Sequence, residues 1–73
     1  MSRMHFGDAI TALKLGKRVA REGWHGNDMW LAIQRPDANS NTPYIYMRTA
    51  DDSRVPWNAS HADILSEDWV VAT

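Results

Sequence analysis

YIYMRTADDSRVPWNASHADILSEDW, residues 44–69, is the stretch that decides the fold of this chain. It opens with an alternating segment, Tyr44–Thr49. In a strand, successive side chains point to opposite faces, so Ile45 and Met47 share one face and the two tyrosines share the other. The alternation predicts a strand that buries its aliphatic face and presents an aromatic one.

The rest of the stretch predicts a turn, an extended segment, a short helix and a last strand. Asp51-Asp52-Ser53 has turn composition, and Arg54–Trp57 is expected to be extended because the residue before a proline avoids helical backbone. Ser60 and Asp63 have the spacing of a capping box, which predicts a helix over His61–Ser66. Asp68–Ala72 is then the closing strand.

The preceding residues supply a longer helix and two more strands. Phe6, Ala9, Ile10 and Leu13 form the apolar stripe of a surface helix over Phe6–Leu15, and Gly16 is placed for a left-handed cap. After it we expect an edge strand at Lys17–Arg21 with Val19 inward, a loop at Glu22–Asp28, a strand at Met29–Gln34 and a polar loop at Arg35–Pro43. This order predicts an α+β fold: one small domain, with an N-terminal helix packed on a mostly antiparallel β-sheet and a second short helix near the C-terminus.

Length and composition restrict the classes of protein to consider. A chain of 73 residues forms one domain (1–73) with a small core, and without cysteine it has neither disulfides nor thiolate metal sites. Its three histidines are scattered, so we predict no metal site and no cofactor. Subunit association is the remaining way to stabilise so small a domain, and four tryptophans favour a homo-oligomer.

The charge and hydropathy patterns exclude two kinds of partner. A net charge of -1 and a pI near 6.2 argue against binding a nucleic acid polymer, which usually requires a strongly basic face. No apolar run is long enough for a membrane span or a secretory signal, so no membrane partner is expected. The sequence therefore predicts a cytoplasmic protein.

The aromatic side of the predicted sheet is the main functional signal. It presents Trp30, Tyr44 and Tyr46, and we expect Trp57 or Trp24 nearby. Such rings stack on nucleobases, which contributes about 1–3 kcal/mol per base. The same face also suits the core of an oligomer, and both interpretations hold together if a site lies between protomers.

The basic residues and the predicted helix start each have a structural alternative. Arg21, Arg48 and Arg54 suit phosphate because a guanidinium binds it through two parallel hydrogen bonds, but Arg48 and Arg54 flank an acidic turn and are equally suited to pairing with Asp51 or Asp52. The run of Lys14, Lys17, Arg18 and Arg21 is typical of a solvated helix end. The residues around Ser60 suit an anion site at a helix N-terminus, although capping alone explains them.

Catalysis has no positive support in the sequence. His25 and His61 are candidate general bases, yet neither has a nucleophile at a motif spacing, and there is no glycine-rich phosphate loop or paired-carboxylate signature. We therefore predict no catalytic residues and no enzyme. A nucleotide hydrolase that uses one of these histidines stays the weaker alternative.

Nearly the whole chain resembles a phage and prophage family, the second type of Thoeris anti-defence protein. The resemblance lies in four segments taken in the same order: residues 6–26 (FGDAI-x-AL-x-x-GK-x-V-x-REGW-x-G), 29–31 (MWL), 43–51 (PYIYMRTAD) and 55–69 (VPW-x-AS-x-x-D-x-L-x-EDW). It implies a homotetramer in the cytoplasm of an infected or lysogenic host, with ligand sites at protomer interfaces. It also implies a sponge, which binds and sequesters a cyclic ADP-ribose isomer of Thoeris signalling without cleaving it. Some members also take up cyclic dinucleotides of CBASS defence.

Motif position and residue chemistry together give the expected ligand-binding residues. Phe6, Trp24 and Trp57 are predicted as apolar or stacking walls, and Arg21 as a phosphate contact. The polar candidates are Tyr46, Arg48, Thr49, Asn58, Ser60 and Asp63. The competing hypothesis is a protein-interaction module, in which the aromatic face binds another chain and no small molecule.

Overall fold

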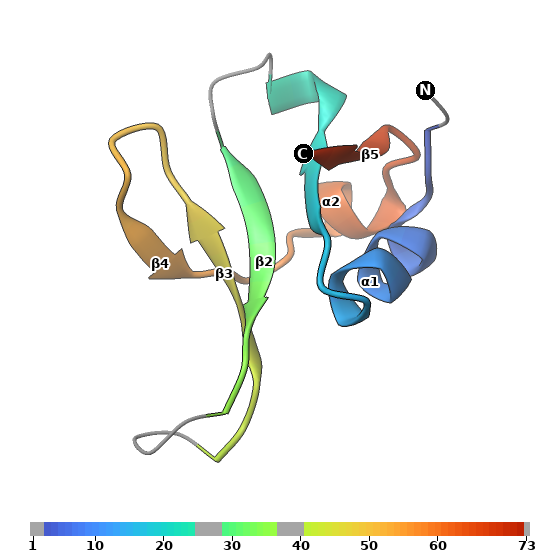
Figure 1. The fold of residues 1–73 in the computed structure, drawn as a ribbon. Coiled ribbons are helices and arrows are strands. Elements are labelled where there is room, and N and C mark those ends of the chain that lie inside the picture. Colours follow the sequence, from blue (N-terminus) through green and yellow to red (C-terminus); the bar gives the residue numbers. More distant parts are fainter. Residues whose placement is uncertain (1–2, 25–28, 37–40, 73) are drawn as a thin grey trace.

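The computed structural model describes residues 3–24, 29–36 and 41–72. Within these residues a five-stranded antiparallel sheet, in the order β4-β3-β2-β1-β5, packs against an N-terminal helix (Figure 1). In chain order the elements are α1 (Phe6–Lys14), β1 (Arg18–Arg21), the 3-10 turn η1 (Glu22–Trp24), β2 (Trp30–Gln34), β3 (Tyr44–Arg48), β4 (Arg54–Pro56), α2 (His61–Leu65) and β5 (Trp69–Ala72). The predicted α+β class is confirmed.

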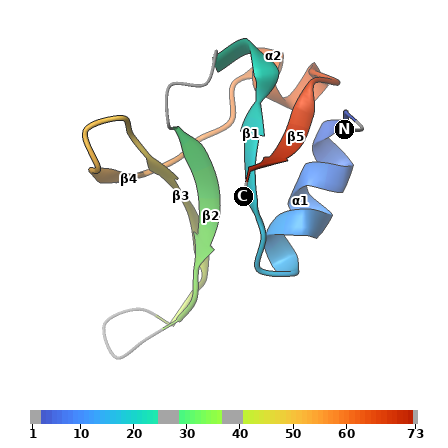
Figure 2. The ribbon, with the colours of Figure 1, turned by 45° about the horizontal axis from the view of Figure 1, so that its top comes forward.

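Helix α1 forms where the apolar stripe predicted it and ends one residue earlier. Ala9, Ala12 and Leu13 are buried against the sheet, while Leu15 is the C-cap and is 70% exposed. Gly16 follows with φ 89°, a left-handed conformation that glycine adopts without the steric cost of a Cβ. The chain thereby turns directly from α1 into β1, as Figure 2 shows.

The prediction that the first strand lies at an edge of the sheet is wrong. Val19 of β1 pairs with Leu31 of β2 on one side, and on the other side β1 pairs with β5 along its whole length, from Arg18 opposite Ala72 to Arg21 opposite Trp69. β5 and β4 are the edges of the sheet. The alternation of a short segment shows which residues face inward, but not which distant strand pairs with it, so this position was not accessible from local pattern.

Strands β2 and β3 form a long antiparallel pair whose two faces differ, as predicted. Leu31 is buried, and Ile33, Ile45 and Met47 pack against the core below α1. Trp30 and Tyr46 lie on the opposite face of the sheet, with their rings 6.2 Å apart. Figures 1 and 2 show the far end of this pair projecting beyond α1, so no helix covers that end.

The core is centred on Trp69, the first residue of β5. Its side chain is fully buried, together with Leu13, Val19 and Leu31. The expectation that Trp24 or Trp57 joins the aromatic face of the sheet is wrong, because both rings pack against Trp69 on the helix side. Trp69 also fixes the N-terminal lead, since its backbone exchanges two hydrogen bonds with Met4, at 2.7 and 3.0 Å.

Two predicted loops lie partly outside the described residues. The loop expected from Glu22 begins instead with the turn η1, and its later part, residues 25–28, lies outside the described residues. Of the loop expected at Arg35–Pro43, residues 37–40 also lie outside them. The capping box and the helix α2 that it predicted are confirmed, although α2 ends at Leu65.

Replacing Trp69 by phenylalanine should lower the free energy of unfolding by about 2–4 kcal/mol, because the smaller ring leaves a cavity and removes the indole donor from the Asp63 carbonyl. Urea unfolding followed by circular dichroism measures this. Trp30→Phe is the matched control, since Trp30 lies half-buried on the uncovered face of the sheet. A loss for Trp69→Phe no larger than that of the control would contradict the central role of Trp69.

Candidate functional site

Four aromatic rings meet beside α2, and we call them the Trp69 cluster. The centroid of the Trp69 ring lies 5.7 Å from that of Phe6, 5.6 Å from that of Trp24 and 6.0 Å from that of Trp57. The Phe6 and Trp57 rings are 6.4 Å apart. Phe6, Trp24 and Trp57 are each half-buried and pack against the core around Trp69. The fold therefore brings together the three residues that the sequence predicts as apolar or stacking walls of the ligand site.

The rings of the cluster come from four separate parts of the chain. Phe6 begins α1, Trp24 ends η1, Trp57 follows β4 and Trp69 begins β5. The position of Trp57 is set by β3, since its backbone N–H donates to the Ile45 carbonyl at 3.0 Å. A ligand that lies on these rings would therefore contact segments that only the tertiary fold brings together.

The start of α2 provides a polar rim next to Trp57. The Ser60 hydroxyl accepts a hydrogen bond from the Asp63 backbone N–H at 3.2 Å, and Asp63 Oδ2 accepts from the Ser60 N–H at 3.1 Å and from the Ser60 hydroxyl at 2.9 Å. Asn58 is exposed between Trp57 and this cap. The cap holds α2 in place, which is the structural role that the sequence left open beside an anion site.

Arg21 binds two carboxylates beside the cluster. Its Nη1 donates to Asp63 Oδ1 and its Nε to Asp68 Oδ1, each at 2.9 Å. Only 22% of the Arg21 side chain is exposed, with 15% for Asp63 and 26% for Asp68, so solvent screens these pairs less than it screens surface pairs. Asp68 Oδ2 also accepts from the Gly23 N–H at 3.2 Å. The Arg21 guanidinium thus lies among groups of the protein itself.

The network shifts the pKa values of its members. Burial raises the pKa of the Asp63 carboxyl, but hydrogen bonds from Ser60 and Arg21 outweigh it and hold that pKa below its ordinary value. The pKa of Asp68 is lowered in the same way, because bonds from Arg21 and the Gly23 N–H exceed the effect of burial. The pKa of Arg21 is raised by its hydrogen bonds to Asp68 and Asp63.

A second group of predicted residues lies on the other face of the sheet. There, arginines stack on aromatic rings: the Arg18 guanidinium carbon is 4.5 Å from the centroid of the Trp30 ring, that of Arg48 is 5.8 Å from the same ring, and that of Arg54 is 5.0 Å from the Tyr46 ring. We call this set the arginine–aromatic face. Tyr46 is only 9% exposed beneath it. The structure therefore separates Tyr46 and Arg48 from the Trp69 cluster.

Arg48 and Thr49 also take part in the turn between β3 and β4. Arg48 Nε donates to Asp52 Oδ1 at 2.9 Å, which is the ion pair that the sequence gave as an alternative to phosphate binding. The Thr49 hydroxyl donates to Asp51, and the Ser53 N–H donates to that hydroxyl at 3.2 Å. Asp52 has φ 69°, which an aspartate tolerates in a tight turn. These contacts give Thr49 a role in the turn.

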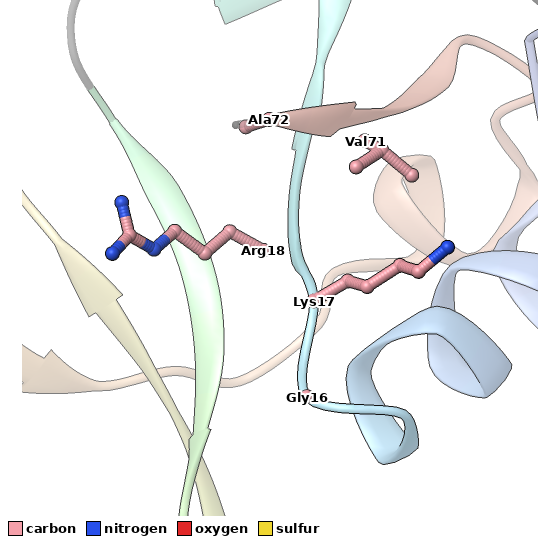
Figure 3. A pocket seen from close by; sticks show the side chains of 5 residues that line it. All are labelled: Gly16, Lys17, Arg18, Val71 and Ala72. Atoms are coloured by element: carbon pink, nitrogen blue, oxygen red, sulfur yellow. The ribbon is translucent and has the colours of Figure 1, made fainter.

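An open hollow of about 310 Å³ lies at the other end of β1 and β5, and it contains none of the predicted site residues. It is lined by Gly16, Lys17, Arg18, Val71 and Ala72 (Figure 3). The figure shows Lys17 and Arg18 extending in opposite directions from β1, Arg18 toward β2 and Lys17 toward α1. Their charges therefore do not converge on one ligand.

Sequence reasoning missed three contributors to these arrangements. Trp69 was expected only as part of a closing strand, Asp68 was not expected to bind Arg21, and Arg18 was assigned to a solvated helix end. Since Arg21 lies directly opposite Trp69 in the sheet, the pairing of β1 with β5 is what brings Arg21 to Asp68. The one available signal was the motif in residues 67–69, an acidic pair followed by tryptophan.

Comparison with known proteins identifies the family. The model of the Thoeris anti-defense 2-like domain matches residues 4–72 of this chain. The chain belongs to this family. It is also 33% identical, over an alignment 87 positions long, to the protein named Thoeris anti-defense 2 of Bacillus phage SP01, with 99% of this chain and 98% of the relative covered. Membership of the Thoeris anti-defense 2 family supports a role in phage anti-defence, as the resemblance implied.

The described residues offer no group of side chains that could hold a metal ion and no helix that could span a membrane. Among residues 3–24, 29–36 and 41–72, no group of three histidine, cysteine or acidic side chains is placed to hold a metal ion. In the same residues, neither helix has the length or the hydropathy needed to cross a lipid bilayer.

The stability of the fold should fall as the pH is lowered below about 5. The reason is that the pKa values of Asp63 and Asp68 are lower in the folded protein than in the unfolded protein, where an aspartate has a pKa near 3.9. The folded state then binds fewer protons, so its stabilisation by these carboxylates is present above the unfolded pKa and is lost below the folded one. Unfolding in urea at several pH values measures the slope. Asp68→Asn should have a smaller slope than wild type, and an equal slope would contradict the assignment.

Proposed function

We propose that this protein binds and sequesters a cyclic nucleotide immune signal without cleaving it. The ligand classes we propose are the cyclic ADP-ribose isomer made by a Thoeris TIR-domain enzyme and the cyclic dinucleotides of CBASS defence. Membership of the Thoeris anti-defense 2 family supports the biological setting. The single structural observation behind the proposal is the Trp69 cluster, in which three half-buried aromatic residues lie beside the polar start of α2.

The cluster has the chemistry that an adenine-containing ligand needs. Phe6, Trp24 and Trp57 offer ring faces and edges whose positions are fixed by Trp69, so a base stacks on them without first ordering flexible side chains. Each stacked base contributes about 1–3 kcal/mol in proteins that bind single nucleotides or strands. The exposed Asn58 side chain supplies donors for ribose or phosphate oxygens, and the Ser60 hydroxyl, whose proton is donated to Asp63, offers an acceptor for a ribose hydroxyl. We expect such a site to release its ligand unchanged, because stacking contacts and hydrogen bonds are not covalent.

We further propose that the protein works as a homotetramer with ligand sites between protomers. The arginine–aromatic face supports this, because a half-buried Trp30 and its neighbours lie on a side of the sheet that α1 does not cover. The small core of the single chain supports it too, since only seven apolar residues are buried among those described. A native mass equal to that of one chain, 8.3 kDa, would contradict this part of the proposal.

A protein-interaction module is the second candidate function. The observation that favours it is the same arginine–aromatic face, where Arg18 and Arg54 are exposed above aromatic rings, a composition typical of protein interfaces. In that case the face binds another protein, and nucleotides have no effect on the thermal stability of the free protein.

A capture-and-release experiment tests the proposed function. The purified protein is incubated with the product of a Thoeris TIR-domain enzyme and, separately, with cyclic dinucleotides. Free ligand is then removed, the protein is denatured by heat, and the released molecules are identified by mass spectrometry. We expect depletion of the signal before heating and its intact release afterwards. Cleaved products would indicate an enzyme, and no capture from either preparation would favour the protein-interaction module.

Trp57→Ala and Trp24→Ala should each weaken binding of the captured signal by about 5- to 150-fold, since the loss of one stacked ring corresponds to roughly 1–3 kcal/mol. Isothermal titration calorimetry on protein that keeps its far-ultraviolet circular dichroism and native mass measures the change. Tyr44→Ala is the control, because Tyr44 is 45% exposed at the start of β3, away from the cluster. Equal affinities for the tryptophan variants and the control would remove the Trp69 cluster from the site.

A further inference from the structure

Arg21 joins two segments that carry different walls of the proposed site. The first segment is the turn η1, and Asp68 connects it to Arg21 through its three oxygens. Its Oδ1 accepts from Arg21 Nε at 2.9 Å, its Oδ2 from the Gly23 N–H at 3.2 Å and its backbone carbonyl from the Glu22 N–H at 3.0 Å. These bonds fix η1, the turn that ends in Trp24.

Asp63 fixes the second segment in the same manner. Its Oδ1 accepts from Arg21 Nη1 at 2.9 Å, and its Oδ2 accepts from both the backbone and the hydroxyl of Ser60. The Asp63 carbonyl accepts from Trp69 Nε1 at 3.0 Å. These bonds hold the start of α2 against the core, a few residues after Trp57 and Asn58 in the chain. The Arg21 guanidinium thus bridges Asp63 and Asp68 through one hydrogen bond to each carboxylate.

The net charge of Arg21 and its two carboxylate partners disfavours the binding of a phosphate. One guanidinium faces two carboxylates, and because their pKa values are lowered, both are ionised at neutral pH. The group of three therefore has a net charge of -1. A phosphate placed against it would meet repulsion from Asp63 and Asp68 and would have to displace hydrogen bonds of 2.9 Å that are only partly screened by solvent.

We propose that Arg21 is a positioning residue for the ligand site and makes no direct contact with the ligand. It sets the distance between Trp24 on η1 and the Trp57–Ser60 segment before α2, through Asp68 and Asp63. This inference rests on the proposed function, in which these segments line the site, and it reassigns the residue that the sequence suggested as a phosphate contact. The geometry of the site walls in the free protein then depends on a network that the ligand does not touch.

The two roles predict opposite effects for Asp68→Asn. If Arg21 positions the walls, the weakened bridge loosens η1, and binding of the cyclic ADP-ribose isomer made by a Thoeris TIR-domain enzyme should weaken by about tenfold, a typical coupling within a shared network. If Arg21 contacts phosphate, removing a neighbouring negative charge leaves binding unchanged or makes it tighter. Asp68→Asn keeps the size of the side chain, so it tests charge and hydrogen bonding with little change in packing.

The experiment uses the wild type, Asp68→Asn, Arg21→Lys and the double variant, each checked for folding and native mass. We expect losses of affinity for both single variants and no further loss in the double variant, because both changes break one bridge. Lysine is expected to rescue little, since a single ammonium does not span two carboxylates as the planar guanidinium does. Unchanged or tighter binding by Asp68→Asn would overturn the proposal, as would additive losses.

Amide hydrogen exchange in the free protein separates this inference from the proposed function. Asp68→Asn and Arg21→Lys should both speed exchange at the Gly23 amide by about tenfold, while the Val19 amide of β1 changes less. This readout needs no ligand, so a protein that binds no cyclic nucleotide still shows whether Arg21 holds η1 in place. Unaltered exchange at Gly23 in both variants would contradict the positioning role even if the ligand binds.

Discussion

The burial of one indole, that of Trp69, is the constraint to which the other parts of this domain conform. Its ring is fully enclosed, and it meets the rings of Phe6, Trp24 and Trp57 from three other parts of the chain. A buried indole N–H must find an acceptor, and the carbonyl of Asp63 at the start of α2 provides it. Packing and hydrogen bonding thus place the short helix at the same time. In a domain of this size, whose core is small, one large side chain supplies much of the apolar burial.

Polar interactions extend this arrangement outward. Arg21 lies opposite Trp69 across the β1–β5 pair and reaches both Asp63 and Asp68, so the sheet, the turn η1 and α2 are connected through one guanidinium. Such a half-buried network stabilises one geometry over others because each member loses its partners if another moves. The half-buried aromatic residues of the Trp69 cluster are thus held from several sides, and such preorganisation is what the proposed sequestration of a small molecule needs.

The two faces of the sheet have different chemistry. The helix side holds the Trp69 cluster and the acidic network, whereas the opposite side stacks Arg18 and Arg48 on Trp30, and Arg54 on Tyr46. The predicted site residues divide between these faces: Phe6, Trp24 and Trp57 belong to the first and Tyr46 and Arg48 to the second. Within one chain the two sets lie on opposite faces of the sheet, an arrangement compatible with the proposed ligand sites between protomers.

The sequence by itself determined the elements and the direction of their side chains. The stripe in α1, the alternation of β3 and the capping box at Ser60 act between residues a few positions apart, so local physics fixes them. Only the tertiary structure decided that β1 lies inside the sheet, that Trp24 and Trp57 join Trp69 and that Arg21 meets two carboxylates. These contacts join residues separated by up to 54 positions, from Arg18 to Ala72, and their formation depends on strand pairing that no short pattern specifies.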